Sequence, residues 1–563
     1  MPKEKLKVIS SGSAPLISAM IRKMGITRHL DEIIDWDRKR CNLSPGTRLA
    51  AFIINILTDR QPLYHISDFY QDHDCEVLFG HGVKAEHFTD DAMARMLDLL
   101  NKVDKIDLYG QLAMMVHQSI YGHNNLKDMH LDRTTISLFG AYDGEETPGA
   151  CKVNRGYSKD RRPDLKQFSA GLAVNSDGLP VLCDVGSGNQ PENPWFRTFI
   201  PRLAAQHAAD ELDEFTAIAD AAFVSEDNLS EFINSEGTVR FSFISRLPAT
   251  FSEEKNVKEK ALGNRSNWVE LGRFVEQKTG ATYQCHSDTV SINGVLYRAL
   301  VFASSSLSKQ KENTLNKAWQ KQKESLLKDC KAAMTSFYAC EADARKAAEA
   351  VISAHSKGVW TTPYEIVDTS GQVTYFTPQQ GRSPKRQTVS SNNDNRIQLV
   401  FGEPIMDEAK AVYQRDMASL FVLITNIPAE KACDREILRR YKEQHKVEVG
   451  FRFLKGPCTL GPVYLNKESR IEALATVFLI AYLVGMAIQI RVRRGVASRE
   501  RKLNVGYRVT DAPTIRVILD LLDSVQVVQD EKGIRTSHNF RYDYMEVLED
   551  CGLDTSIWTE IPD

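Results

Sequence analysis

The spacing of apolar residues is helical over the first part of the chain. In "LSPGTRLAAFIINIL" we expect Ser44 to cap a helix beginning at Pro45, because proline is favoured at the first helical position. In "FTDDAMARMLDLL" the same pattern predicts a helix capped by Thr89 or Asp90. No segment of this region alternates apolar and polar residues as strands do. The pattern therefore predicts a helical N-terminal domain at 1–122.

From about residue 125 the pattern changes to short runs of apolar and β-branched residues, which are typical of strands. The runs "FSAGLAVN" and "LPVLCDVG" are separated by "SDG", which predicts a hairpin. The predicted elements are a strand at 129–139, strands at 168–175 and 179–186, a helix at 193–209, a strand at 215–220, a helix at 225–233 and a strand at 239–245. This order predicts the first part of an α/β domain, at 123–247.

The order of predicted strands and helices changes at 248–412, which predicts an inserted domain. "ATYQCHSDTVSINGVLYRALVFAS" predicts a β-hairpin or meander turning at "INGV", and two long polar helical segments after it predict a helical hairpin. "TPYEIVDTSGQVTYFTP" predicts a strand pair around "TSG", and "GRSPKRQTVSSNNDN" predicts a polar loop. The α/β domain then resumes at 413–503 with a strand in "SLFVLITN", and 504–563 forms a C-terminal region.

After that strand, "RRYKEQHKVEVGFRFLKGP" predicts one helix over 439–457. Its buried stripe is Val447, Phe451 and Leu454, at positions i, i+4 and i+7. A second, polar set lies within about 60° on the helical wheel. That set is Tyr441, Gln444, Glu448 and Lys455. The plainer interpretation is a solvated rim, and the sharper one is a strip of functional groups.

Composition narrows the function classes without settling them. The 563 residues carry a net charge of only -3, so any nucleic-acid binding must use local basic patches. None of the ten cysteines forms a C-x-x-C pair, which favours reduced thiols over zinc sites or disulfides. The apolar segment 473–488 is shorter than the ~20 residues of a membrane span, so we expect a buried core helix. The N-terminal "MPKEKLKVISSGSAP" has no long apolar run, so we expect no signal peptide.

Three carboxylates form the candidate chemistry. Asp132 lies inside a predicted strand, Asp220 ends another, and Glu448 lies on the later helix. Each alone is explained by a cap, a turn or a solvated charge. Brought together, three carboxylates can hold two divalent ions about 3.5–4 Å apart, which activate an attacking oxygen and stabilise the leaving oxygen of a phosphodiester. Mg²⁺ suits such oxygen ligands, with Mn²⁺ as its substitute. No GxxxxGK[ST] loop is present in the sequence, which disfavours a nucleotide-driven motor.

At these residues the sequence resembles the bacterial insertion-sequence DDE transposases. Asp132 in "HLDRTTISLF", Asp220 in "AIADAAF" and Glu448 in "YKEQHKVEVGFRFLK" resemble the DDE triad. Tyr441, Glu448 and Lys455 match the spacing of the Y-(2)-R-(3)-E-(6)-K signature of the insertion-sequence-four superfamily, long-chain branch. The resemblance covers about 40–500. It implies an RNase H-like core, a mixed sheet flanked by helices, with a large α+β insertion and a helical N-terminal domain.

One signature residue departs from the family, since Gln444 stands where the family has arginine. Arg452 falls near the same face and offers a compensating charge. The block "GYSKDRRPDLKQF" also resembles a family block, and its basic residues are candidates for phosphate contacts. A second basic run, "RVRRGVASRERK", is a candidate of the same kind. The residues expected to contact DNA are Tyr441, Gln444, Arg452, Lys455, Lys159, Arg161 and Arg162.

The sequence thus predicts a transposase that cleaves DNA at the ends of an insertion sequence and joins them to target DNA. Its expected partners are double-stranded DNA, as terminal inverted repeats and target, and a second copy of the chain when DNA is bound. No membrane partner is expected, and the expected location is the nucleoid-associated cytoplasm of a bacterium. The N-terminal domain would bind DNA ends or dimerise. Two alternatives stay open: a related nuclease that does not join strands, and a catalytically inactive DNA-binding relic.

Overall fold

The computed structural model describes most of the chain. The described residues are 7–122, 126–143, 147–209, 215–233, 241–273, 280–368, 373–379, 382–389, 397–456, 465, 467–506 and 508–562. The chain divides into two compact units. The first unit comprises Met1–Arg246, Ile292–Val295 and Thr425–Asp563, and the second comprises Leu247–Ser291 and Leu296–Ile424.

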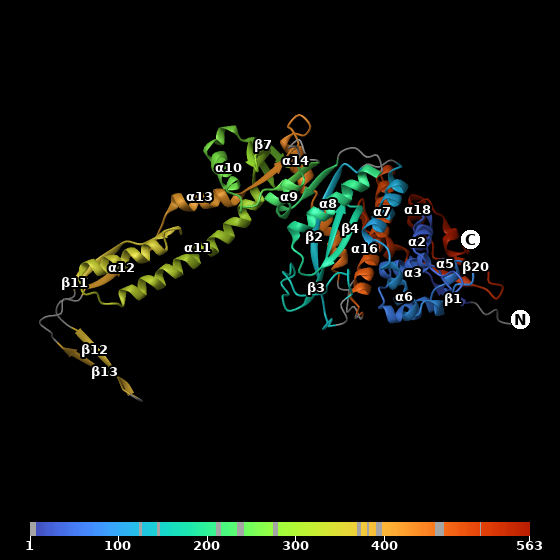
Figure 1. The fold of residues 1–563 in the computed structure, drawn as a ribbon, viewed down its shortest axis with the longest axis horizontal. Helices are drawn as coiled ribbons and strands as arrows, with labels where there is room; N and C mark the ends of the chain where they lie inside the picture. The colour runs from blue at the N-terminus through green and yellow to red at the C-terminus, as the bar shows by residue number, and fades with distance from the viewer. Residues whose placement is uncertain are drawn as a thin grey trace. The chain divides into compact units, whose positions relative to one another are not determined.

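Among the described residues, a mixed sheet of nine strands has the order β4-β3-β2-β5-β6-β16-β9-β8-β7. Its strands in the first unit are β2 (Asp128–Leu138), β3 (Lys166–Val174), β4 (Pro180–Ser187), β5 (Thr216–Ala219) and β6 (Ser242–Arg246). Figure 1 labels β2, β3 and β4 beside α8 (Glu192–Ala209). The strands β2, β3 and β4 pair antiparallel, whereas β5 runs parallel to β2 and β6 parallel to β5. The predicted mixed sheet, including the hairpin turning at "SDG", is confirmed. The predicted strand in "SLFVLITN" is β16 (Leu420–Thr425).

Helices cover both faces of this sheet, and the alternation of side chains along β3 shows how. At Gly171 an added Cβ would meet Trp195 of α8 (Glu192–Ala209) at 2.3 Å. The next residue, Leu172, points to the opposite face and contacts Gly450 of α15 (His445–Leu454). Thus α8 covers one face, and α15 covers the other.

The predicted helical region is confirmed, with one added strand. Its helices are α1 (Ala14–Lys23), α2 (Ile26–Ile33), α3 (Pro45–Leu57), α4 (Ile66–Gln71), α5 (Cys75–Phe79), α6 (Asp90–Leu100) and α7 (Lys105–Tyr121). Ser44 caps α3 and Thr89 caps α6, each accepting a backbone N–H, as predicted. The strand β1 (Lys7–Ser10) is too short to show alternation, and it pairs with β19 (Gln526–Gln529). The described part of this region lies in the same compact unit as the strands β2 to β6 of the mixed sheet.

The long apolar helix α16 (Glu468–Ser498) lies at the centre of the first unit. It is long and apolar enough to cross a membrane, but 94% of its most apolar window is buried inside the protein. It packs against α3, α6, α7 and α18 (Tyr542–Cys551). The predicted buried core helix is therefore confirmed, but it is longer than the segment 473–488. The charged Glu472 stays inside the helix because it pairs with Lys105 at 3.0 Å and accepts the Cys151 N–H.

The helix predicted over 439–457 is wrong as a single element. The structure has α14 (Asp434–Lys442) and α15, broken at Glu443 and Gln444. At the break the Gln444 N–H donates to the Tyr441 carbonyl and the Lys446 N–H to the Glu443 carbonyl, so the turn is tighter than an α-helix. The wheel that placed Tyr441 on one face with Glu448 therefore does not apply. The buried stripe of α15 is as predicted.

In the second unit, β7 (Val269–Arg273), β8 (Thr282–Ile292) and β9 (Val295–Ser304) are neighbours in the sheet, and the predicted hairpin β8–β9 is confirmed. The helical hairpin is α11 (Ser305–Met334) and α12 (Glu341–Ala354). The unit also contains α10 (Ser252–Gly263) and α13 (Glu408–Ser419).

Both strands predicted around "TSG" are present, but their predicted pairing with each other is wrong. Instead β11 (Tyr364–Asp368) pairs with β14 (Ile397–Phe401), because Leu399 of β14 is buried against α12. The strand β12 (Val373–Gln379) pairs with β13 (Arg382–Val389). The strand β13 lies in the segment where a polar loop was expected. The rest of that expected loop, residue 381 and residues 390–395, lies outside the described residues.

Candidate metal centre

Two of the predicted carboxylates meet because their strands are parallel neighbours. In the β2–β5 ladder Leu131 pairs with Ala219, so the next residues, Asp132 and Asp220, emerge side by side. The Asp132 carboxylate accepts the Arg133 N–H at 2.7 Å. The Asp220 carboxylate caps the short helix that follows β5, accepting the Ala222 N–H at 3.0 Å. Both side chains are thus held by the sheet edge from which they project.

A third carboxylate, Glu192, completes the cluster. One ligand oxygen from each of Asp132, Glu192 and Asp220 lies within 4.8 Å of the others. Glu192 is the first residue of α8. Sequence reasoning missed it because an acid in the first turn of a helix is adequately explained by the helix dipole. Its only sequence signal is its place directly after the third strand of the sheet, at the start of the next helix.

The lysine Lys159 lies against this cluster. Its Nζ is 3.1 Å from Glu192 Oε1 and 3.6 Å from Asp132 Oδ1, and it also donates to the Arg133 carbonyl. The next residue, Asp160, pairs with Lys455 at the end of α15, at 2.8 Å. A tight turn at Arg161, whose φ of 58° is uncommon for a residue other than glycine, sends the chain back. The loop therefore places one positive charge within the acidic cluster.

The pKa values of two of the clustered carboxyl groups, Asp132 and Glu192, are raised by burial and by repulsion between carboxylates. Burial, together with the charges of Asp220 and Glu192, raises the pKa of Asp132 to about 7 although Lys159 opposes the shift. Burial also raises the pKa of Glu192, again with a contribution from Asp220. Burial alone would lower the pKa of Lys159, but attraction by these carboxylates raises it. A bound cation would reduce the repulsion between these carboxylates. Their oxygen atoms are the hard donors that Mg²⁺ and Mn²⁺ prefer.

The predicted third carboxylate, Glu448, is placed differently. Glu448 does not belong to the carboxylate cluster found among the described residues. The Glu448 side chain is exposed on α15. Its charge nevertheless acts on Tyr441, as do the charges of Asp132 and Asp220, while Arg246 acts in the opposite direction. The pKa of Tyr441 rises to about 12, chiefly by burial, with contributions from Asp220, Asp132 and Glu448. The Tyr441 hydroxyl is therefore protonated and lies in the field of all three predicted acids.

The remaining predicted DNA contacts fall into two groups. Gln444 is engaged within the protein: its Nε2 donates to the Leu131 carbonyl at 2.8 Å, and its Oε1 lies 3.3 Å from His130 Nδ1. Arg452, Arg161 and Arg162 are exposed, and Arg162 forms an ion pair with Asp164.

The second basic run, "RVRRGVASRERK", is largely engaged inside the protein. Arg491 donates to the Ser119 carbonyl, Arg493 to the Pro513 carbonyl, and Arg499 pairs with Asp550. These contacts favour a structural role for the run over the predicted phosphate contacts.

A buried polar network fixes α8, and with it Glu192, on the sheet. The Asp184 carboxylate of β4 accepts the Trp195 indole N–H at 2.9 Å and the Gly171 N–H at 3.1 Å. Arg133 donates to the Ser169 hydroxyl and lies 5.7 Å from the Trp195 ring centre. Because Gly171 has no Cβ, the Trp195 ring can lie directly on β3. The position of Glu192 thus depends on a packing contact rather than on the carboxylates.

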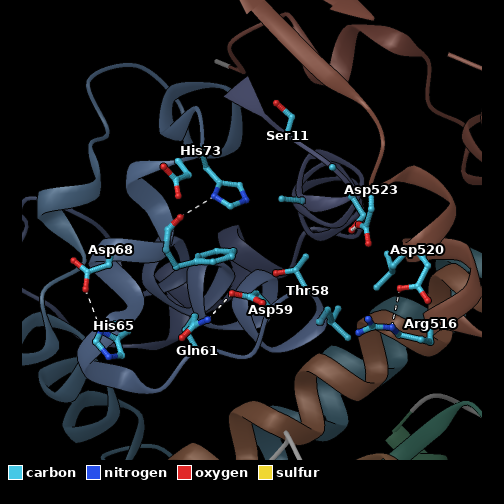
Figure 2. Close-up of a pocket in the computed structure, with 17 residues that line it drawn as sticks. Ser11, Thr58, Asp59, Gln61, His65, Asp68, His73, Arg516, Asp520 and Asp523 are labelled. Atoms are coloured by element: carbon cyan, nitrogen blue, oxygen red, sulfur yellow. Dashed lines mark hydrogen bonds and ion pairs between the residues drawn. The ribbon is translucent and has the colours of Figure 1, made fainter. Parts of the chain in front are cut away.

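A cavity of about 660 Å³ lies elsewhere in the first unit (Figure 2). It is lined by α3, α4 and α17 (Ile515–Leu522) and contains no predicted site residue. His65 pairs with Asp68 and Arg516 with Asp520 along its wall (Figure 2). Three further aspartates line it: Asp59, Asp72 and Asp523. With five aspartates against one arginine and two histidines, the charge of this wall disfavours phosphate binding.

Two family models match the chain. The family model described as "Transposase DDE domain" matches residues 129–484, and "Domain of unknown function (DUF4277)" matches residues 7–114. No curated protein matches the chain. A solved structure described as a cryo-EM structure of a piggyBac transposase synaptic complex with hairpin DNA is similar at 8% identity and a TM-score of 0.35. That similarity covers 91% of this chain and 79% of the other.

Proposed function

Because the chain belongs to the family of the transposase DDE domain, and is thus a DNA-cleaving and strand-transferring enzyme, we propose that Asp132, Asp220 and Glu448 are its catalytic metal ligands. The observation that supports this proposal most is the register of β2 and β5, which brings Asp132 and Asp220 together at one sheet edge. Glu448 is included because its charge acts on the same tyrosine as those two acids. In this proposal the RNase H-like mixed sheet holds the first two, and α15 would bring the third to them.

The donor set fits two Mg²⁺ ions, with Mn²⁺ as a substitute, because all the candidate ligands are carboxylate oxygens. When bound, such a pair of ions activates the attacking oxygen and stabilises the leaving oxygen of a phosphodiester. The sheet edge would hold Asp132 and Asp220 fixed while Glu448 approaches from α15. Glu192 lies close enough to contribute an additional oxygen.

The residues around the acids would hold the DNA strand. We propose that the protonated Tyr441 hydroxyl and Lys455 contact successive phosphates, as the Y-R-E-K signature of the insertion-sequence-four superfamily implies. Arg452, Lys159, Arg161 and Arg162 would supply further positive charge to the DNA. Gln444 would reach a phosphate only by giving up its bonds to β2. Such phosphate contacts position the strand without reading its sequence.

The biological setting follows from the same resemblance. The DNA partners would be the terminal inverted repeats of an insertion sequence and the target duplex, in the bacterial nucleoid. Residues 1–122 would recognise the repeat ends or join two copies of the chain, which act as a homodimer on DNA. The insertion at 248–412 would contact DNA near the active site.

The test is metal-dependent nicking of DNA that carries the element's ends. We expect Asp132→Asn, Asp220→Asn and Glu448→Gln each to abolish nicking while DNA binding persists. Glu430→Gln, at an exposed glutamate outside the helices and strands, is the matched control and should nick normally. If Glu448→Gln cleaves normally and Glu192→Gln does not, then Glu192 is the third ligand and our assignment is wrong. Joining of the cleaved ends to target DNA separates a transposase from a nuclease that only cuts.

A further inference from the structure

The long helix α11 in the second unit has one buried face and one strongly basic face. Its buried residues are Trp319, Leu326 and Cys330. At 100° per residue these three lie within about 40° of one another on the helical wheel. Trp319 packs against Val359 and Ala411, and Arg415 lies over its ring. The helix is thus anchored along one side, which fixes the direction of its other side.

Five exposed lysines gather on that other side, and we refer to them as the α11 lysine stripe. They are Lys309, Lys317, Lys321, Lys328 and Lys331. On the wheel they fall within an arc of about 120°, and along the axis they span about 33 Å. None of the five has an ion-pair partner among the described residues. The one acid inside the arc, Glu324, accepts a hydrogen bond from Gln320 at 3.0 Å.

Two other lysines of α11 fall outside the arc. Lys311 lies about 80° beyond its edge, and Lys323 lies about 40° beyond the opposite edge. Lys323 is also engaged, since its Nζ lies 4.8 Å from the centre of the Trp360 ring. The positive charge of the stripe is therefore arranged as a row and is not simply the average charge of the helix.

We propose that the α11 lysine stripe binds the phosphate backbone of duplex DNA. The proposal rests on the proposed function for the presence of DNA, and it adds a contact surface remote in sequence from the catalytic residues. Duplex DNA fits because it is a linear polyanion, and one helical turn spans about 34 Å, close to the length of the stripe. Lysines at the two ends can then contact phosphates one turn apart or on either side of a groove. Such contacts are independent of base sequence.

Binding is measured by fluorescence anisotropy with a 40-base-pair duplex, without divalent ions, across a salt series. The test variant is Lys317→Gln, Lys321→Gln and Lys328→Gln combined. The control combines Lys311→Gln, Lys346→Gln and Lys357→Gln, which removes the same charge from exposed lysines of the same unit outside the stripe. Thermal melting establishes that both proteins are folded.

We expect the stripe variant to lower the slope of log K against log salt by roughly 2–3, since each lost phosphate contact contributes about 0.9. Its affinity should fall about 10- to 100-fold at moderate salt, and the control should change far less. Equal losses in the two variants would show that only total charge matters, and would overturn the proposal.

The outcome is separable from that of the proposed function. Because binding is measured without divalent ions, a failure of cleavage by the wild type leaves the result on the stripe intact. Conversely, a wild type that cleaves and joins DNA while the stripe variant binds normally refutes the stripe alone.

Discussion

Replacing Lys159 with glutamine should make the metal-free centre bind divalent ions more tightly. In the structure the Lys159 ammonium neutralises Asp132 and Glu192, at 3.6 Å and 3.1 Å. A divalent ion drawn to the same carboxylates must compete with that charge. Glutamine keeps much of the length of the side chain and removes the charge, so the variant isolates the competition.

The magnitude follows from Coulomb's law. Two charges at these distances attract by about 1 kcal/mol at the dielectric constant of water and about 5 kcal/mol at an effective value of 20. Lys159 is 33% exposed, which places each of its two pairs toward the weaker end of that range. A combined loss of about 2 kcal/mol is a reasonable middle value, and it corresponds to roughly 30-fold in affinity.

The assay is calorimetric titration of Mn²⁺ into the protein without DNA. We expect Lys159→Gln to bind Mn²⁺ about 30-fold more tightly than the wild type. The variant should also melt at a lower temperature than the wild type in chelator, because its clustered carboxylates have lost their counterion. Lys127→Gln removes an exposed lysine just before β2 and should change neither quantity. Unchanged or weaker Mn²⁺ binding by Lys159→Gln would refute the idea that its ammonium competes with the metal.

Three further substitutions test the scaffold around the centre. Gly171→Ala should destabilise the protein by about 1–3 kcal/mol in urea unfolding, since its Cβ would lie 2.3 Å from Trp195, whereas Gly263→Ala should be neutral. Lys455→Ala should weaken binding of cleaved ends and lower the salt slope by about one phosphate contact; an unchanged slope would mean that this lysine serves only its ion pair. Gln444→Ala should cost about 1–3 kcal/mol of stability by leaving buried groups of β2 unpaired; weaker DNA binding with unchanged stability would instead favour the predicted phosphate contact.

The parts of the fold that sequence patterns predicted are those in which local spacing and burial agree. The strands β2 to β5 could be predicted from the sequence because each is a short apolar run that ends at a turn or a helix cap. Caps at Ser44 and Thr89 were readable because their chemistry is local. Asp132 stood out because a carboxylate inside a strand is disfavoured. The adjacency of Asp132 and Asp220 then needed only parallel pairing of their strands.

The errors arose where a distant residue decides the local structure. The break before α15 is stabilised by Gln444. Its side-chain amide donates a hydrogen bond to the Leu131 carbonyl of β2, more than 300 residues earlier in the chain. The strand β11 pairs with β14 because Leu399 is buried under α12, not because of the turn that follows β11. The helix α16 begins at Glu468, before Glu472, because Lys105 neutralises the Glu472 carboxylate inside the helix. None of these partners is visible in the local sequence.

The same reasoning explains why the third carboxylate was the hardest part of the site to assign. Asp132 and Asp220 are fixed by a ladder of backbone hydrogen bonds, so few side-chain changes can separate them. Glu192, which lies in the cluster, and Glu448, which we propose as a ligand, are carried by the helices α8 and α15. One helix is seated by Trp195 on Gly171, and the other by Gln444 on β2. The positions of both helices therefore depend on one packing contact and one hydrogen bond, neither of which involves a carboxylate of the centre. It follows that a substitution at either contact should impair cleavage without touching a carboxylate, and that restoring the contact, not the charge, should repair it.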